Sequence, residues 1–287
     1  MTILPLPGTV PYQVAVPAPG SGPQWWVGGA SAVELPDGSF AIAWRERRGS
    51  GEDDAVVLSR SGDGVRFETV AVLDKRAHGA AMTERPALIR LPEGRWRMYA
   101  SFATPGTFHW WVGLIEADTF ERLGKAPHAV VFPGNAYTAV KDPVVRHDGT
   151  RWHAWLCHHL LDIPGAEDRM ETAWATSDDG LTWTPPITVL RGRPGAWDQR
   201  GARLTAILPN GGATYDGRAT QEENWFERTG VAIRDGEHGF AATGEPVSTG
   251  RYLEVLPLRE GGCRIWYEQV LPDESHELRT EVIPAST

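Results

Sequence analysis

The chain has 287 residues, of which 41% are hydrophobic and 23% charged, and its formal net charge is −9. This composition is that of a globular protein and speaks against disorder, a membrane-spanning helix, and a nucleic acid or anionic membrane as partner. Residues 1–19 lack the basic start and apolar core of a signal peptide, so we expect a cytoplasmic protein, or an exported one whose signal has been removed.

An internal repeat predicts the fold. An apolar strand, a tight turn containing glycine and a second strand recur five times, with turn glycines 56, 55, 62 and 50 residues apart. These glycines are Gly38, Gly94, Gly149, Gly211 and Gly261. A period of this length is typical of propellers. We therefore expect an all-β protein, a five-bladed β-propeller with four antiparallel strands in each blade.

In chain order, the blades are expected at about 26–73, 78–132, 135–190, 197–247 and 250–283. The fifth unit ends after its third strand, so a strand within 9–16 is expected to complete that blade and close the ring. The closed ring would make 1–287 a single domain. The two cysteines, Cys157 and Cys263, lie in apolar strand patterns and predict buried free thiols.

Two turns, 61–67 and 177–183, each contain aspartate, then glycine, then an aromatic residue. An aspartate in such a turn accepts hydrogen bonds from backbone N–H groups, and the glycine adopts a positive φ. We expect Asp63 and Asp179 to be structural for this reason.

Function is expected on the face that carries the entrances of the innermost strands and the loops between second and third strands. The entrances contain Trp25-Trp26, Glu84-Arg85-Pro86, Lys141-Asp142-Pro143, Trp197-Asp198-Gln199-Arg200 with Arg203, and Arg251-Tyr252 with Glu254. The loops add Arg45-Glu46-Arg47, Phe108-His109-Trp110, His158-His159 with Asp162, Asp216-Gly217-Arg218, 222–225 and Glu268. Because proline cannot donate to a strand ladder, Pro143 is expected at the first position of a strand.

The five-unit period, the Lys141-Asp142-Pro143 entrance and the aspartate turns resemble the five-bladed glycoside hydrolases of the arabinanase/xylosidase and invertase/levansucrase groups. The resemblance in architecture covers the whole chain, and the motif match covers a few residues. It implies a base or nucleophile aspartate at the blade-one entrance, a second aspartate that holds the sugar or tunes a pKa, and a later glutamate as acid. Asp142 matches the second role. Residues 26–31 contain no carboxylate, so either Glu84 or Asp198 takes the first role or the hydrolytic chemistry is altered or absent.

The predicted catalytic carboxylates are Asp142, Glu84 and Glu254. Aromatic rings cover the apolar face of a sugar, and carboxylates and guanidiniums bind its hydroxyls. On that ground the predicted substrate-binding residues are Trp26, Arg85, His109, Trp110, Lys141, His158, Trp197, Asp198, Arg200, Arg203, Asp216, Arg218, Arg251 and Tyr252. The alternative is a structural ion network in which Glu84 pairs with Lys141, and Asp142 with Arg85 or Arg200.

The expected partner is a small saccharide or glycoside held at the axis and cleaved by paired carboxylates. It would be neutral if the arginines are all paired, or anionic, such as a uronate, sialate or phosphorylated sugar, if they outnumber the carboxylates. Two other functions stay open: a non-hydrolytic carbohydrate-binding propeller, and a tailoring enzyme that performs elimination or cyclisation. No cofactor or metal is predicted, since His158 and His159 are adjacent on a strand and point to opposite faces.

Overall fold

The computed structural model describes residues 4–49 and 54–285, and within them it contains twenty β-strands, two short 3-10 helices and no α-helix. Blade one comprises β2 (Trp25–Glu34), β3 (Phe40–Arg48), β4 (Ala55–Ser61) and β5 (Glu68–Leu73). Blade two comprises β6 (Thr83–Arg90), β7 (Trp96–Ala103), β8 (Trp110–Ala117) and β9 (His128–Phe132). Blade three comprises β10 (Thr138–His147), β11 (Trp152–Leu160), β12 (Met170–Ser177) and β13 (Ile187–Leu190). Blade four comprises β14 (Gly201–Ile207), β15 (Ala213–Arg218), β16 (Arg228–Asp235) and β17 (Gly239–Ser248). Blade five comprises β18 (Arg251–Pro257), β19 (Cys263–Val270), β20 (His276–Ile283) and β1 (Gln13–Val16). The 3-10 helices are η1 (Lys75–His78) and η2 (Phe120–Gly124). The predicted five-bladed propeller is confirmed.

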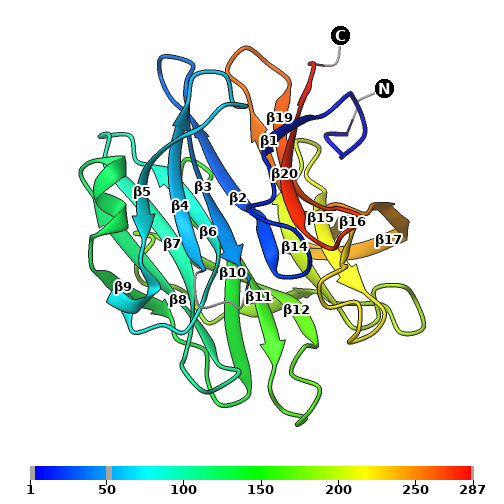
Figure 1. Cartoon of the computed structure of the whole chain (residues 1–287). Coiled ribbons are helices and arrows are strands. Elements are labelled where there is room, and N and C mark those ends of the chain that lie inside the picture. Colours follow the sequence, from blue (N-terminus) through cyan, green and yellow to red (C-terminus); the bar gives the residue numbers. More distant parts are fainter. Residues whose placement is uncertain (1–3, 50–53, 286–287) are drawn as a thin grey trace.

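The ring closes as predicted, because the N-terminal strand β1 pairs antiparallel with β20 and supplies the fourth strand of blade five. Figure 1 shows this blue strand beside the red C-terminal strand. Backbone groups of Gly8 and Val10 also donate to the carboxylate of Glu281 on β20, at 2.7 and 3.1 Å. No helix of the described part of the chain has the length and apolar character needed to cross a membrane.

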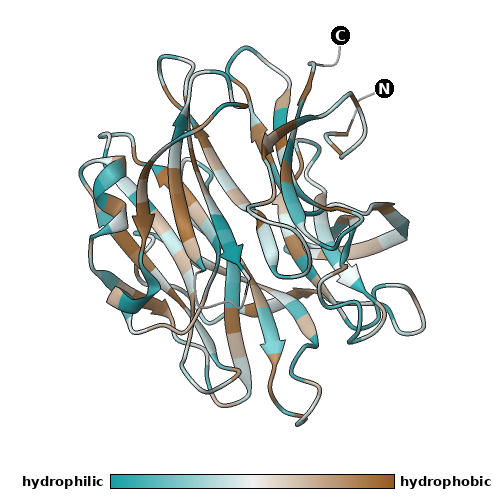
Figure 2. Cartoon of the chain, in the orientation of Figure 1, coloured by the Kyte–Doolittle hydropathy of each residue, from teal (hydrophilic) through white to brown (hydrophobic). Residues whose placement is uncertain are grey.

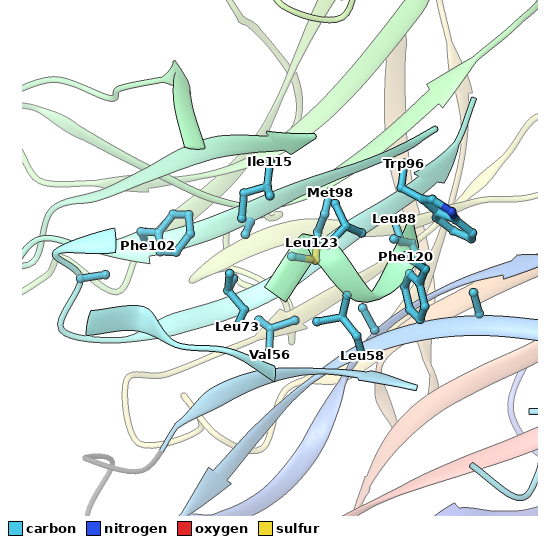
Figure 3. Close-up of a cluster of buried hydrophobic side chains, with 14 of the residues drawn as sticks. Val56, Leu58, Leu73, Leu88, Trp96, Met98, Phe102, Ile115, Phe120 and Leu123 are labelled. Carbon is cyan, nitrogen blue, oxygen red and sulfur yellow. The ribbon is translucent and has the colours of Figure 1, made fainter. Parts of the chain in front are cut away.

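Hydrophobic side chains between neighbouring blades form the core. The strands carry most of the hydrophobic residues, shown in brown in Figure 2, and the connecting loops are mostly hydrophilic or neutral. Figure 3 shows the cluster between blades one and two, where Leu58 and Leu73 face Met98 and Ile115, and Phe120 of η2 packs between them. Each of these five side chains is fully buried, so the two blades hold each other in place.

The two aspartate turns are structural, as predicted. Asp63 accepts from the N–H groups of Val65 and Arg66 at 2.9 and 2.8 Å, and Asp179 binds its own turn in the same way. Each turn also docks on another blade, since the Trp266 indole donates to the Gly64 carbonyl and the Tyr99 hydroxyl to that of Gly180. The backbone hydrogen bonds lower the pKa of both aspartates to about 2.

Every innermost strand has a β-bulge, at the same level in four blades and nearer to the following turn in blade four. The register against the second strand shifts between Gly28 and Ser31, Glu84 and Ala87, Lys141 and Val144, Leu204 and Ala206, and Arg251 and Glu254. The first bulge residue has a positive φ in three blades, namely +60° at Gly29, +51° at Asp142 and +52° at Tyr252. A bulge redirects side chains and interrupts pairing, so these strands can aim polar groups at the axis.

The bulge corrects the expected place of Pro143. This proline lies inside β10 and not at its start. Strand pairing is interrupted at the bulge, so the residue at this position needs no backbone N–H donor, which proline lacks. Pro86 occupies the matching position in β6.

Candidate functional site

A small cavity of about 40 Å³ lies at the axis on the face of the strand entrances. It is lined by Trp26, Arg45, Glu84, Lys141, His159, Arg203, Asn224, Trp225, Glu227, Arg251 and Tyr252. A water molecule takes up about 30 Å³ of the liquid, so in this conformation the cavity has room for about one. The lining of the cavity is mostly polar and charged, and it includes six of the predicted site residues.

Tyr252 lies between two of the predicted catalytic carboxylates. Its hydroxyl oxygen is 3.3 Å from Oε2 of Glu84 and 3.3 Å from Oδ2 of Asp142. The Arg203 guanidinium donates to that hydroxyl at 2.9 Å and to Asp142 at 3.2 Å. The two carboxylate oxygens are therefore at most 6.6 Å apart, twice the distance to the hydroxyl. This limit is compatible with the carboxyl separations of glycoside hydrolases, about 5–5.5 Å for retention and from about 6.5 Å for inversion.

The electrostatics of the pair come from burial and from neighbouring cations. Burial alone would raise the pKa of Glu84, but the charges of Arg45, Lys141 and Arg47 outweigh it and lower the pKa to about 2. Burial raises the pKa of the Tyr252 hydroxyl well above its usual range. At neutral pH, then, Glu84 is an ionised carboxylate and Tyr252 is a protonated donor. Oδ1 of Asp142 is buried and has no hydrogen-bond partner within the described chain.

Glu268 of blade five places a carboxylate at the blade-one entrance, which has none of its own. Its carboxylate accepts from Arg45 and from Arg251, each at 2.7 Å, and also contacts His276. Burial would raise the pKa of Glu268, but the charges of Arg251 and Arg45 hold it well below the usual range. This carboxylate, from blade five, lies beside Gly28 at the blade-one entrance.

Buried cations outnumber buried carboxylates around the cavity. The six cations are Arg45, Arg47, Lys141, Arg203, Arg218 and Arg251, and the five carboxylates are Glu84, Asp142, Asp216, Glu227 and Glu268. Most are in close ion pairs, such as Arg203 with Asp216 and Arg218 with Glu227, both at 2.8 Å. The ammonium of Lys141 is the exception, since it is 3.8 Å from Asp142, beyond hydrogen-bond distance. It also lies 5.1 Å from the ring centroid of Trp110. Lys141 is thus the cation of this set that has no hydrogen-bonded carboxylate.

His159 presents an acceptor at the cavity. Its Nδ1 is 3.1 Å from the carbonyl oxygen of Glu167, which can only accept, so Nδ1 carries the proton. Nε2 is then unprotonated, and this buried atom has no partner within the described residues. Burial and the charges of Lys141 and Arg218 lower the pKa of His159 well below its usual range, so the ring is neutral. A ligand hydroxyl could donate to this nitrogen.

Trp225 covers the cavity from the solvent side. Its ring is 5.8 Å from that of Trp26 between centroids, and its side chain is 45% exposed. Trp26 is buried, and the guanidinium of Arg47 lies 4.8 Å from its ring centroid. Trp225 thus belongs both to the lining of the cavity and to the surface of the protein.

The structure brings ten of the predicted site residues together. Trp26, Glu84, Lys141, Arg203, Arg251 and Tyr252 line the cavity, Asp142, Asp216 and Arg218 lie directly behind it, and Trp110 lies beside Lys141. The alternative pairing is corrected: Glu84 pairs with Arg45 and Arg47, and Asp142 with Arg203.

The other seven lie elsewhere. Glu254 and Arg85 form an ion pair at 2.9 Å towards the opposite end of the axis. The bulge at Tyr252 turns Glu254 away from the cavity. Trp197 packs against Tyr215, and Asp198 accepts from Arg193 and Tyr215, so Asp198 is not free for the blade-one role. Arg200 pairs with Asp168 at the rim, His109 bonds to Thr104, and His158 faces away from the cavity that His159 lines.

Five lining residues were missed from the predicted set although they lie in or beside loops and strands recognised on this face: Arg45, His159, Asn224, Trp225 and Glu227. Alternation along β3 could have identified Arg45, which shares a face with Arg47. The described residues contain no group of three or more His, Cys, Asp or Glu side chains placed to hold a metal ion.

Comparison with known proteins supports the fold at low sequence identity. No protein-family model matches the chain, and none of the curated protein sequences is significantly similar to it. Among solved structures, a thermostable family-43 glycoside hydrolase has a TM-score of 0.69 and 12% identity, with 89% of each chain covered. The α-L-arabinofuranosidase from Lactobacillus brevis has a TM-score of 0.64 and 12% identity, with 89% of this chain and 90% of that chain covered. The β-1,2-mannobiose phosphorylase from Listeria innocua has a TM-score of 0.61 and 14% identity, with 97% of this chain and 92% of that chain covered. The chain therefore has the fold of these glycoside-processing propellers.

Proposed function

We propose that the protein binds and cleaves a glycoside at the axial cavity, with Glu84 and Asp142 as the paired carboxylates. The observation that carries the proposal is the Tyr252 hydroxyl, which lies 3.3 Å from each of two carboxylates of different blades and so limits the distance between them to a value compatible with glycoside cleavage. Glu84 supplies the permanently ionised group, and Asp142, with one oxygen free, supplies the second carboxyl. The solved structures of similar fold include glycoside hydrolases and a mannobiose phosphorylase.

The surroundings of Lys141 support an anion in the reaction. Lys141 is the cation that no carboxylate meets within hydrogen-bond distance, and it lines the cavity. Its ammonium is buried near Asp142 and Glu84 without a hydrogen bond to either carboxylate, so its donors are available to a substrate carboxylate or a phosphate. We assign Lys141 to that anion and the Nε2 of His159 to a sugar hydroxyl.

The test is turnover of a panel of nitrophenyl glycosides, including a glucuronide, with and without inorganic phosphate. We expect Glu84→Gln and Asp142→Asn each to lower kcat at least about 100-fold, as loss of an acid–base group does. Glu237→Gln is the matched control, because that side chain is 87% exposed. Full turnover in either carboxylate variant would refute the assignment. Dependence of turnover on phosphate would identify phosphorolysis.

A second candidate, sugar binding without cleavage, is favoured by one observation. The place of a blade-one carboxylate is filled by Glu268 and by Arg85, which lies 3.3 Å from where a Cβ of Gly29 would be. Calorimetric titration with the same sugars separates the two functions, since binding without turnover in the wild type supports this candidate.

A further inference from the structure

A second and larger cavity lies at the opposite mouth of the axis. Its volume is about 410 Å³, within the range of roughly 300–1,000 Å³ typical of small-molecule sites. The innermost strands of all five blades contribute to it, and its walls are mainly apolar, with Ala87, Val144, Val145, Ala206, Val255 and Leu256 among them.

An ion pair lies at the inner end of this cavity. Arg85 of β6 donates to the Thr205 carbonyl at 2.8 Å and to Glu254 at 2.9 Å, and Glu254 accepts from the Ala32 N–H at 3.2 Å. These contacts join β6 to β14, β18 and β2. Arg85 and Glu254 line this cavity and not the one beneath Trp225, so the two mouths of the axis are separate sites.

The cavity holds more positive than negative charge. Its lining contains Arg85, Arg90 and Arg146, and Glu254 is its one carboxylate within the described residues. Arg146 donates to the Val255 carbonyl at 3.4 Å, and no carboxylate of the described chain is in ion-pair distance of it. Nε of Arg85 is also buried without a partner. Burial lowers the pKa of Arg146, and the charge of Glu254, which is already paired with Arg85, opposes that shift only in part.

We propose that this cavity binds a small organic carboxylate, with its charged group on Arg146 and its hydrocarbon part against the apolar walls. One guanidinium presents two parallel N–H donors, which match a single carboxylate. A hydrocarbon chain gains free energy from leaving water for walls such as Val144 and Leu256. The site is independent of glycoside cleavage at the other mouth.

The test is a ligand-detected NMR titration with sodium hexanoate and, as the uncharged counterpart, hexanol. We expect hexanoate to bind at least about tenfold more tightly, because a hydrogen bond to a charged group contributes that much or more. Arg146→Gln should lower hexanoate affinity to that of hexanol. Two controls keep wild-type affinity: Arg259→Gln, an exposed arginine in the turn after β18, and Lys141→Gln at the other mouth.

Absence of hexanoate binding, equal affinity for hexanoate and hexanol, or unchanged affinity in Arg146→Gln would each overturn the proposal. Loss of binding in Lys141→Gln would overturn it too, because it would place hexanoate at the axial cavity. If Arg146→Gln does not fold, the wild-type comparison and the Lys141→Gln control decide.

Discussion

A Cβ atom at Gly28 would lie 2.7 Å from the Cβ of Glu268 and closer still to its carboxylate. Glycine at this position therefore leaves room for Glu268, the common partner of Arg45 and Arg251. The carboxylate that blade one lacks is replaced in space by one from blade five, which serves the ion network.

Gly28→Ala should destabilise the protein by about 3 kcal/mol, because the added methyl group must displace Glu268 and break buried ion pairs. Gly62→Ala is the matched control, since nothing lies within 4 Å of its Cβ position and, like Gly28, it has no positive φ. Urea unfolding measures both. Equal stability of the two variants would show that Glu268 can move without cost.

Because of Glu84, the free energy of unfolding should decrease as the pH becomes acidic. Its pKa in the folded protein is about 2, against an ordinary value of 4.5, so its contribution is complete above pH 4.5 and is lost as the pH falls towards 2. The shift corresponds to roughly 3 kcal/mol. We expect Glu84→Gln to be less stable at pH 7 and to lose less stability between pH 4.5 and 3. Unfolding at several pH values checks this, and a wild-type slope in Glu84→Gln, with Glu237→Gln as control, would contradict it.

Tyr252→Phe should show whether the Tyr252 hydroxyl positions the two carboxylates for the reaction or only stabilises the fold. The ring that packs 3.8 Å from the Arg203 guanidinium remains, while the hydroxyl shared by Glu84 and Asp142 is lost. We expect a tenfold or larger loss of kcat with a changed pH profile, and a stability loss of only about 1 kcal/mol. Tyr215→Phe is the control, because it removes a hydroxyl hydrogen bond to Asp198 outside the cavity. Equal kinetic effects in both variants would show that the role of Tyr252 is structural.

Deletion of residues 1–16 should lower the melting temperature of the whole propeller. The deletion removes β1, its pairing with β20, and the donors that Glu281 accepts from Gly8 and Val10. Glu281→Gln, which weakens those hydrogen bonds and keeps the strand, should have a smaller effect. Calorimetry would contradict ring closure as a source of stability if the truncated chain melted like the full one.

The fold could be predicted from the sequence because its signals are local and repeated. Five turn glycines set the period, and aspartate turns such as that of Asp179 satisfy their own backbone and identify the end of a third strand. The missing fourth strand of the last unit also pointed to the N-terminal segment as its source.

The site was predicted less well because neighbouring residues at a bulge face different ways. Tyr252 and Glu254 are two residues apart and would share a face in a regular strand, yet they line opposite mouths of the axis. His158 and His159 show a related difficulty, since alternation says that one of them points inward but not which. The partners of Glu268 lie 223 and 17 residues away in sequence, and nothing near Glu268 indicates them.

The bulges also bear on how such a protein can change over evolutionary time. Because a bulge residue such as Asp142 or Tyr252 sits where the pairing of its strand is already interrupted, exchanging its side chain does not in itself remove a ladder hydrogen bond. Such positions can therefore change what the centre binds while the strand pairing of the blades is kept. In this arrangement, the propeller can be retained in evolution while the ligand bound at its axis changes.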